Sequence, residues 1–201
     1  MTHAPNVSRE TLPMLEHLAA RVDHWSRRIN LVSRRSLDDL WTRHILDSVQ
    51  LFDLRKPDAR HWVDLGSGGG FPGLVIAILA HDDMPTLRVS LVESDHRKAA
   101  FLQTTARELD LRVTVHAQRA EAIPPLQADV LSARALAPLP TLLGLAEHHL
   151  SLGGRALFPK GARHEAEIAA VRASFRFDLQ KVPSRTDSTA AILVIEGVGR
   201  V

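Results

Sequence analysis

The sequence predicts an α/β protein built on a doubly wound, mostly parallel sheet with an antiparallel last strand and a helical N-terminal extension. Two observations support this prediction. From residue 61 onward, short apolar runs alternate with longer amphipathic stretches, as in strands joined by crossover helices. The first of these units contains a Gly-rich turn, residues 64–73, between an apolar run ending at Val63 and an apolar helix beginning near Pro72.

The N-terminal extension, residues 1–57, is predicted to be helical and to precede the core at residues 58–201. Its apolar side chains recur at three- and four-residue steps, which gives helices with one apolar face. Ser8 and Ser36 are expected to cap two helices, and residues 30–33 to separate them. Because 201 residues are too few for two full domains, we expect one domain with an appendage.

The core is expected to hold five parallel strands followed by an antiparallel pair. Strands are predicted at 61–65, 88–93, 112–116, 128–133, 154–159, 175–182 and 191–198. Helices are predicted at 72–80, 96–109, 137–150 and 162–173. The turn-rich segment 183–188 predicts that the last two strands are antiparallel. Pro159 is expected to end the fifth strand abruptly, which would shift Lys160 outward.

The composition is that of an ordinary globular protein. Apolar residues make up 45% and charged residues 24% of the chain. No apolar run approaches the roughly 20 residues of a membrane span, and residues 1–10 carry no signal-peptide core. The chain has no cysteine, and its 11 histidines are scattered. We therefore expect no membrane association, no metal site and a cytoplasmic location.

The Gly-rich turn predicts a nucleotide-type ligand. Glycines let backbone N–H groups approach a ligand that β-carbons would keep away. Glu93 ends the next strand, where a carboxylate can accept hydrogen bonds from ribose hydroxyls. The spacing Gly68-x-Gly70-x-x-Gly73 also satisfies the dinucleotide fingerprint, so a nicotinamide cofactor is one alternative. Asp64 would repel a pyrophosphate and favours a positively charged cofactor. A second alternative is that the glycines only shape a tight turn.

Six segments, taken together and in order, resemble one enzyme family. They are residues 28–33, 43–48, the Gly-rich turn, 92–102, 132–135 and 160–161. Over about residues 23–161 the chain resembles the bacterial 16S ribosomal RNA guanine-N7 methyltransferases, once called the glucose-inhibited division protein B family. The resemblance implies a Rossmann-like class I methyltransferase fold. It also implies methyl transfer from S-adenosyl-L-methionine to N7 of one guanine (guanine-527) of 16S ribosomal RNA, with S-adenosyl-L-homocysteine as product.

The resemblance also assigns a cofactor site. Its expected residues are Asp64, Gly66, Gly68, Gly70, Phe71, Glu93, Ala120, Glu121 and Arg134. Glu93 would accept the ribose hydroxyls, while Ala120 and Glu121 would bracket the adenine ring. The alternatives are that Glu93 is a solvated acid that caps a helix and that Glu121 is a surface charge. Arg134 could instead be a structural partner of Asp64 or Asp129.

The expected substrate site positions a base rather than activating it. Guanine N7 has a lone pair and no proton, so we expect no general base. The expected positioning residues are Asn30, His44, Ser48 and Lys160. The residues expected to contact RNA are Arg27, Arg28, Arg34, Arg35, Arg97 and Lys160. Arginine suits phosphate recognition, although such a cluster can also be a solvated face.

Two rival functions stay open on the sequence alone. One is an NAD-dependent oxidoreductase that uses the glycine fingerprint. The other is a non-enzymatic RNA-binding or ribosome-assembly module that keeps the fold. For the favoured reading we expect 16S ribosomal RNA in the small ribosomal subunit as partner. We also expect a monomer, because the sequence has no sustained heptad pattern.

Overall fold

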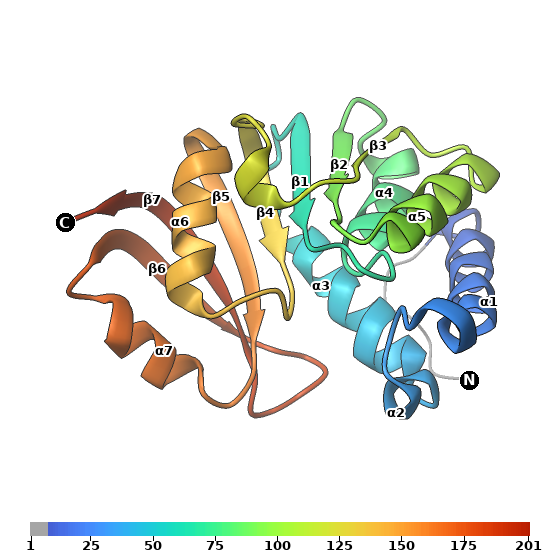
Figure 1. The fold of residues 1–201 in the computed structure, drawn as a ribbon, viewed down its shortest axis with the longest axis horizontal. Coiled ribbons are helices and arrows are strands. Elements are labelled where there is room, and N and C mark those ends of the chain that lie inside the picture. The colour runs from blue at the N-terminus through green and yellow to red at the C-terminus, as the bar shows by residue number, and fades with distance from the viewer. Residues whose placement is uncertain (1–7) are drawn as a thin grey trace.

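One mixed sheet organises the molecule (Figure 1). The computed structural model describes residues 8–201, without the side chains of Arg34 and Arg35. Seven strands lie in the order β3-β2-β1-β4-β5-β7-β6. Strands β1 to β5 pair in parallel, whereas β7 is antiparallel to both of its neighbours. This confirms the predicted mostly parallel sheet with an antiparallel last strand.

The elements follow the predicted order closely. The strands are β1 (His61–Leu65), β2 (Arg88–Val92), β3 (Val113–His116), β4 (Ala128–Ala133), β5 (Leu150–Lys160), β6 (Phe175–Pro183) and β7 (Ala191–Arg200). The core helices are α4 (Gly73–Asp83), α5 (His96–Glu108), η2 (Ala120–Ala122), α6 (Leu139–His149) and α7 (His164–Val171). The extension contains α1 (Thr11–Ile29), α2 (Arg34–Leu37), η1 (Trp41–Leu46) and α3 (Asp47–Asp53).

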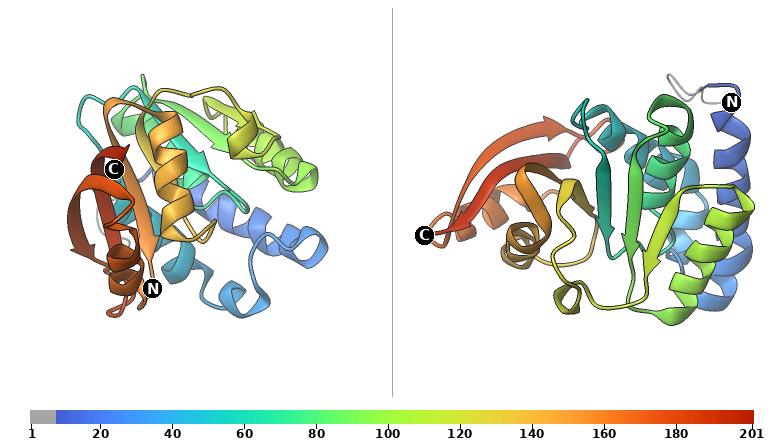
Figure 2. Two further views of the ribbon diagram at one scale, coloured as in Figure 1. Left: turned by 60° about the vertical axis from the view of Figure 1, so that its left-hand side comes forward. Right: turned by 90° about the horizontal axis from the view of Figure 1, so that it is seen from above.

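Helices cover both faces of the sheet (Figure 2). Successive residues of a strand point to opposite faces, and the two hydrophobic clusters follow this alternation. Trp62 of β1 and Val130 of β4 belong to the cluster formed with α1, α3, α4 and α5. Val63 and Leu131 belong to the cluster formed with α6 and α7. The result is a three-layer α/β/α arrangement with the sheet in the middle.

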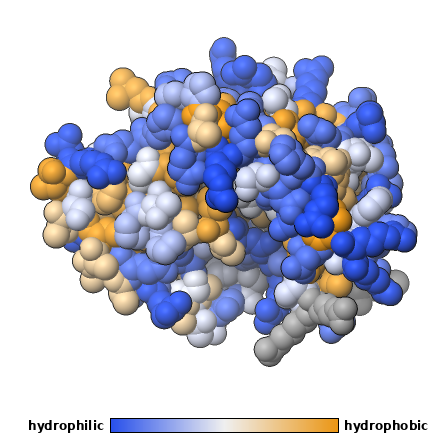
Figure 3. Space-filling view, viewed as in Figure 1, coloured by the Kyte–Doolittle hydropathy of each residue, from blue (hydrophilic) through white to orange (hydrophobic). Residues whose placement is uncertain are grey.

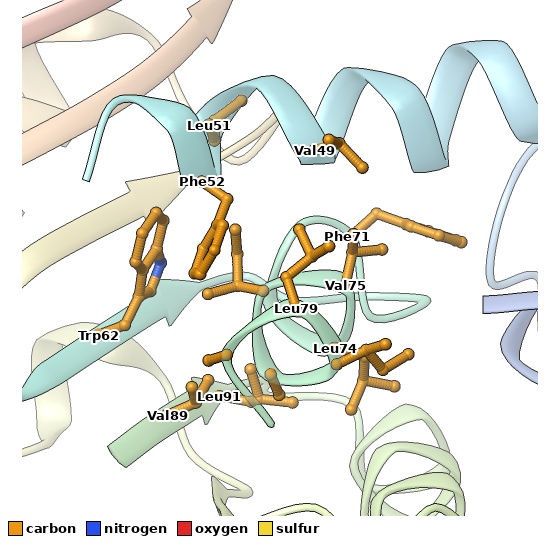
Figure 4. Packing of buried hydrophobic residues seen from close by; sticks show 14 of the residues in the cluster. Val49, Leu51, Phe52, Trp62, Phe71, Leu74, Val75, Leu79, Val89 and Leu91 are labelled. Carbon is orange, nitrogen blue, oxygen red and sulfur yellow. The ribbon is translucent and has the colours of Figure 1, made fainter. Parts of the chain in front are cut away.

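The N-terminal extension shares the first of these clusters with the core. Figure 4 shows Val49 and Phe52 of α3 above Leu79 of α4, with Trp62 of β1 beside Phe52. Burial of each such large side chain contributes about 1.5–3 kcal/mol. Helix α1 lies beside α5 (Figure 2). The extension therefore packs into the core, and its division from the core at residue 57 stays a prediction.

The helix caps of the extension differ in part from the prediction. Ser8 Oγ accepts a hydrogen bond from the Thr11 N–H at 3.1 Å, as a cap does, although α1 begins after Glu10. Ser33, rather than the predicted Ser36, caps α2, because its Oγ accepts from the Ser36 N–H at 3.3 Å. The helix begins two residues before Ser36, whose hydroxyl donates back to the Ser33 carbonyl at 2.9 Å.

Pro159 does not end the fifth strand, so that prediction was wrong. Strand β5 continues to Lys160 and pairs with β7 along Pro159 and Lys160. Its pairing with β4 ends earlier, at Leu157. The missing proline N–H therefore falls beyond the last β4–β5 pair, so that ladder loses no hydrogen bond there.

Candidate cofactor and base site

The predicted cofactor residues gather at the carboxyl edge of the sheet. The Gly-rich turn follows β1, Glu93 follows β2, Ala120 follows β3 and Arg134 follows β4. Lys160 lies at the carboxyl end of β5. Parallel strands bring these positions together although they span almost 100 residues, and this edge is where open α/β sheets bind ligands.

The Gly-rich turn leaves room for a ligand at Gly68. Its φ of +55° is a left-handed value, and a β-carbon built there would meet only the Gly66 carbonyl oxygen, at 3.8 Å. Gly66 differs, because its β-carbon would approach Leu136 Cδ1 at 2.6 Å. Gly68 is therefore open towards a ligand, whereas Gly66 is required for packing.

Glu93 holds the turn in place and keeps capacity to bind more. Its Oε2 accepts a hydrogen bond from the Gly68 N–H at 2.9 Å, and its Oε1 accepts one from the Asp95 N–H at 2.8 Å. The side chain is only 8% exposed. Asp95, not Glu93, caps α5 by accepting from the Arg97 N–H. The geometry thus disfavours a solvated capping role and leaves carboxylate lone pairs for hydroxyl donors.

Asp64 is fully buried beneath the turn. Its Oδ1 accepts from Ser132 Oγ at 2.7 Å, and its Oδ2 accepts from the Gly73 N–H at 3.1 Å. Ser132 Oγ in turn accepts from Trp62 Nε1 at 2.9 Å. Burial raises the pKa of Asp64 to about 6. The carboxylate supports the first turn of α4, and a direct contact with the cofactor stays a prediction.

The segment predicted to read adenine is a short 3₁₀ turn, η2. Ala120 is buried at its first position, and Glu121 is exposed beside it. Within the part of the chain that the structure describes, neither the Ala120 N–H nor the Glu121 N–H has a hydrogen-bond partner. Free N–H groups next to an exposed carboxylate match the acceptor and exocyclic amine of adenine.

Arg134 connects the sheet edge to the N-terminal extension. Its Nη2 donates to His44 Nδ1 at 2.6 Å, and its Nη1 donates to the Arg43 carbonyl at 3.0 Å. The same nitrogen lies 3.6 Å from Asp47 Oδ2. Its salt-bridge partner is therefore Asp47, neither of the two acids, Asp64 and Asp129, considered from the sequence.

His44 is held as a neutral imidazole. A guanidinium can only donate, so His44 Nδ1 accepts and Nε2 carries the hydrogen. Burial, and then the charge of Arg134, lower the pKa of His44 to about 4. The ring stacks on Phe71 with centroids 5.0 Å apart. Phe71 itself belongs to the Gly-rich turn, so this stack joins the turn to the extension.

A cavity of about 680 Å³, here called the interface cavity, adjoins this network. Its walls come from the extension, the ends of β4 and β5, and the β6–β7 loop. The lining residues are Ser36, Asp39, Arg43, His44, Asp47, Arg134, Ala135, Pro159, Lys160, Gly161, Ser184, Thr186, Asp187, Ser188, Ala190, Ala191 and Ile192. His44 and Lys160 line this cavity, whereas the two other predicted positioning residues do not. Ser48 is buried and donates to the His44 carbonyl, and Asn30 is exposed at the end of α1.

The β6–β7 loop is the part of this cavity that sequence reasoning missed. Thr186 Oγ1 donates to Asp47 Oδ1 at 2.9 Å, and Gln50 Nε2 donates to the same oxygen at 2.7 Å. The Arg185 N–H donates to Gln50 Oε1 at 3.0 Å. The contacts made by Thr186 and Arg185 each bridge more than 130 residues of sequence. The only local signal was a polar, turn-rich segment.

Lys160 lies at the edge of the cavity with its charge already paired. Its Nζ donates to Glu167 Oε2 at 2.8 Å and to the Ala137 carbonyl at 3.1 Å. Glu167 Oε2 also accepts from the Leu139 N–H at 3.0 Å. Lys160 therefore holds the β4–α6 loop against α7, and its predicted contact with RNA stays a prediction.

Three of the predicted RNA-binding arginines, Arg27, Arg28 and Arg97, are exposed at the surface. Arg27 is exposed near Asp23, and Arg28 lies over the Trp25 ring. Arg97 is 70% exposed and pairs with Asp95 at 3.2 Å. The side chains of Arg34 and Arg35 lie outside the described residues. In the view of Figure 3, hydrophilic side chains predominate over α1 and α5.

Neither a metal-binding cluster nor a membrane-spanning helix is found among the described residues. Among residues 8–201 no group of three or more His, Asp or Glu side chains is arranged to hold a metal ion. No helix in the described part of the chain has both the length and the apolar character needed to cross a membrane.

Comparison with known proteins assigns the family. The family model described as rRNA small subunit methyltransferase G matches residues 11–192. Proteins called ribosomal RNA small subunit methyltransferase G are similar over most of their length. That of Ruegeria pomeroyi is 53% identical over 98% of this chain and 96% of its own. That of Cereibacter sphaeroides is 50% identical over 98% and 95%.

Solved structures support the fold. A methyltransferase from Geobacter sulfurreducens has a TM-score of 0.59 at 14% identity, covering 96% of this chain and 92% of its own. The T. thermophilus 16S rRNA N2 G1207 methyltransferase, in complex with AdoMet and guanosine, has a TM-score of 0.53 at 15% identity, covering 74% and 38%. By its family-model match and its 50–53% identity to those relatives, the chain belongs to the rRNA small subunit methyltransferase G family.

Proposed function

We propose that this chain methylates N7 of one guanine of 16S ribosomal RNA, with the cofactor at the Gly-rich turn and the target base in the interface cavity. Family membership makes the chain an S-adenosylmethionine-dependent rRNA methyltransferase, so the nicotinamide alternative is excluded. The choice of N7 and of guanine-527 follows the family resemblance. The observation that supports the site best is the Glu93 carboxylate bound to the Gly68 N–H at the open face of the turn.

The residues at the sheet edge fit S-adenosylmethionine. Gly68 offers a surface free of side chain, Glu93 offers acceptors for the ribose hydroxyls, and the Ala120–Glu121 peptide offers the free Glu121 N–H for the adenine ring. When bound, the cofactor supplies an electrophilic methyl group on a sulfonium. Asp64, buried behind the turn, adds a negative field that favours this positive charge while it is ionised.

The interface cavity is suited to holding the base in line. Its three walls bring His44, Arg134 and Lys160 together, and none of them has to take a proton because N7 carries none. His44 stays neutral, which avoids adding a further positive charge beside a ring that becomes positively charged. Proximity and alignment of this kind can lower the activation free energy by about 7–11 kcal/mol.

The proposed function also implies a partner, an oligomeric state and a location. We place the partner as 16S ribosomal RNA within the small ribosomal subunit, with Arg27, Arg28, Arg34, Arg35, Arg97 and Lys160 as phosphate contacts. We also propose a monomer in the cytoplasm. The target base has to leave its stack, which costs a few kcal/mol, and backbone contacts by arginine can offset this cost.

The test is transfer of a labelled methyl group from S-adenosylmethionine to small ribosomal subunits that lack the modification. Cleavage chemistry specific for N7-methylguanine then maps the labelled nucleotide. Label at one N7-methylguanine of 16S RNA supports the proposal. Label on another atom or nucleotide contradicts it, and cofactor binding without transfer to any ribosomal RNA would favour a non-enzymatic role.

A further inference from the structure

Two histidines at the end of α6 contact the turn that we assign to adenine. His149 is completely buried, and its Nε2 lies 3.0 Å from the Ala120 carbonyl oxygen. The neighbouring His148 places its Nε2 3.0 Å from the Ile123 carbonyl oxygen. Ala120 is the first residue of η2 and Ile123 follows its last, so the last turn of α6 holds this short segment at both ends.

The protonation of His149 follows from its partner. A carbonyl oxygen only accepts, so Nε2 must carry the hydrogen, and Nδ1 is then a bare acceptor. Nδ1 is buried and has no hydrogen-bond partner in the described part of the chain. Burial also lowers the pKa of His149. An apolar side chain would fill this space without an unsatisfied nitrogen, so the hydrogen bond to Ala120 is the feature that histidine adds.

Fixing the Ala120 carbonyl has a geometric consequence at the sheet edge. The peptide unit between Ala120 and Glu121 is planar and trans, so the Glu121 N–H points opposite to the carbonyl that His149 holds. The Ala120 and Glu121 N–H groups both lack partners among the described residues. The hydrogen bond from His149 of α6, together with that from the Ile123 N–H at 3.3 Å, thereby sets the direction of the free Glu121 N–H.

We propose that His149 is a positioning residue for the adenine ring, which it serves by holding the Ala120–Glu121 peptide in the orientation that presents its N–H to adenine N1. The inference rests on the proposed cofactor site at the Gly-rich turn. It adds a residue from α6, which none of the sequence motifs contains. His149 itself touches no ligand and acts through the backbone.

The test compares two ligands that differ only in the base. S-Adenosylhomocysteine has an acceptor at N1, whereas S-inosylhomocysteine carries a hydrogen there and a carbonyl in place of the amine. Calorimetric titration of the full chain gives both dissociation constants for wild type, His149→Phe and His149→Gln. Phenylalanine keeps the ring without the donor, while glutamine restores an N–H. His81→Leu, at an exposed position of α4, is the matched control.

We expect wild type to prefer the adenosyl ligand by about tenfold or more, as sites built to pair a polar group do. His149→Phe should reduce this preference at least threefold, mainly by lowering the affinity for the adenosyl ligand. His149→Gln should restore part of the preference. The rate at saturating cofactor should stay within about twofold. His149→Leu and His149→Asn provide the same ratio if the phenylalanine variant fails to fold.

Three results would overturn the inference. A His149→Phe protein that binds both ligands less well by the same factor has a merely structural histidine. A preference that does not change excludes positioning. A wild-type protein that binds neither ligand removes the proposed cofactor site, and the inference with it.

Discussion

The Gly-rich turn and the interface cavity lie side by side at one sheet edge, yet they are built in different ways. The turn is closed by hydrogen bonds between residues of the first two strand ends, such as the Gly68 N–H to Glu93. The cavity is closed by side chains from both ends of the chain, such as Thr186 to Asp47. The turn also presents bare backbone, whereas the cavity presents charged and polar side chains.

The difference shows which part of the site can vary without disturbing the other. Two sets of contacts link the Gly-rich turn to the interface cavity. One is the stack of His44 on Phe71, and the other is Arg134 between His44 and Asp47. Substitutions away from these links should affect either the cofactor or the RNA. Single substitutions on either side of these links test this separation.

Glu93→Ala should nearly abolish cofactor binding. The change removes two backbone hydrogen bonds and the proposed ribose acceptor, and hydrogen bonds to a charged group contribute about 1.5–3 kcal/mol each. We expect S-adenosylhomocysteine to bind at least about 100-fold more weakly by calorimetry. Glu93→Gln should be intermediate. An alanine variant that binds within threefold of wild type would show that the ligand lies elsewhere.

Two glycine substitutions should separate packing from binding. In Gly73→Ala the new β-carbon would lie 2.2 Å from Leu91 Cδ2, so we expect a loss of about 1–3 kcal/mol in unfolding free energy. Gly68→Ala meets no such clash and should cost about 1–2 kcal/mol for its positive φ. Cofactor affinity should fall far more in Gly68→Ala. Equal losses of affinity at equal stability would contradict the assignment of Gly68 to the ligand face.

Asp64 should make stability depend on pH. Its folded pKa, about 6, is raised from 3.8 mainly by burial, so the native state binds the proton more tightly. The free energy of unfolding should therefore fall as pH rises from about 4 to 6, by at most about 1.4 kcal/mol per unit. Asp64→Asn should lack this slope. Denaturant titrations at several pH values measure it, and parallel curves for the two proteins would refute the buried-acid account.

Thr186→Val, at the interface cavity, should affect the binding of RNA and not that of the cofactor. It removes the hydroxyl that joins the β6–β7 loop to Asp47 while keeping the side-chain shape. We expect the KM for small ribosomal subunits to rise up to about tenfold, because a hydrogen bond to a carboxylate is lost. Cofactor affinity should not change. The control is Thr189→Val, whose hydroxyl contacts only Asp187.

The gathering of the proposed cofactor residues at one sheet edge could be predicted from the sequence because their signals are local. Gly68 and Glu93 lie in short motifs at strand ends, and the fold brings strand ends together. The lining of the interface cavity could be predicted only in part. Thr186 and Gln50 meet through tertiary packing that no local pattern encodes. The burial of Ser48 was missed because its side chain returns to its own helix backbone.

The most direct test of the separation is to measure two affinities on the Glu93→Ala protein, one for S-adenosylhomocysteine and one for small ribosomal subunits. We expect the first to be lost while the second stays within about threefold of wild type, because none of the described residues that line the interface cavity or are proposed to bind RNA is hydrogen-bonded to Glu93. Loss of subunit binding in parallel, from a protein with an unchanged melting temperature, would contradict it.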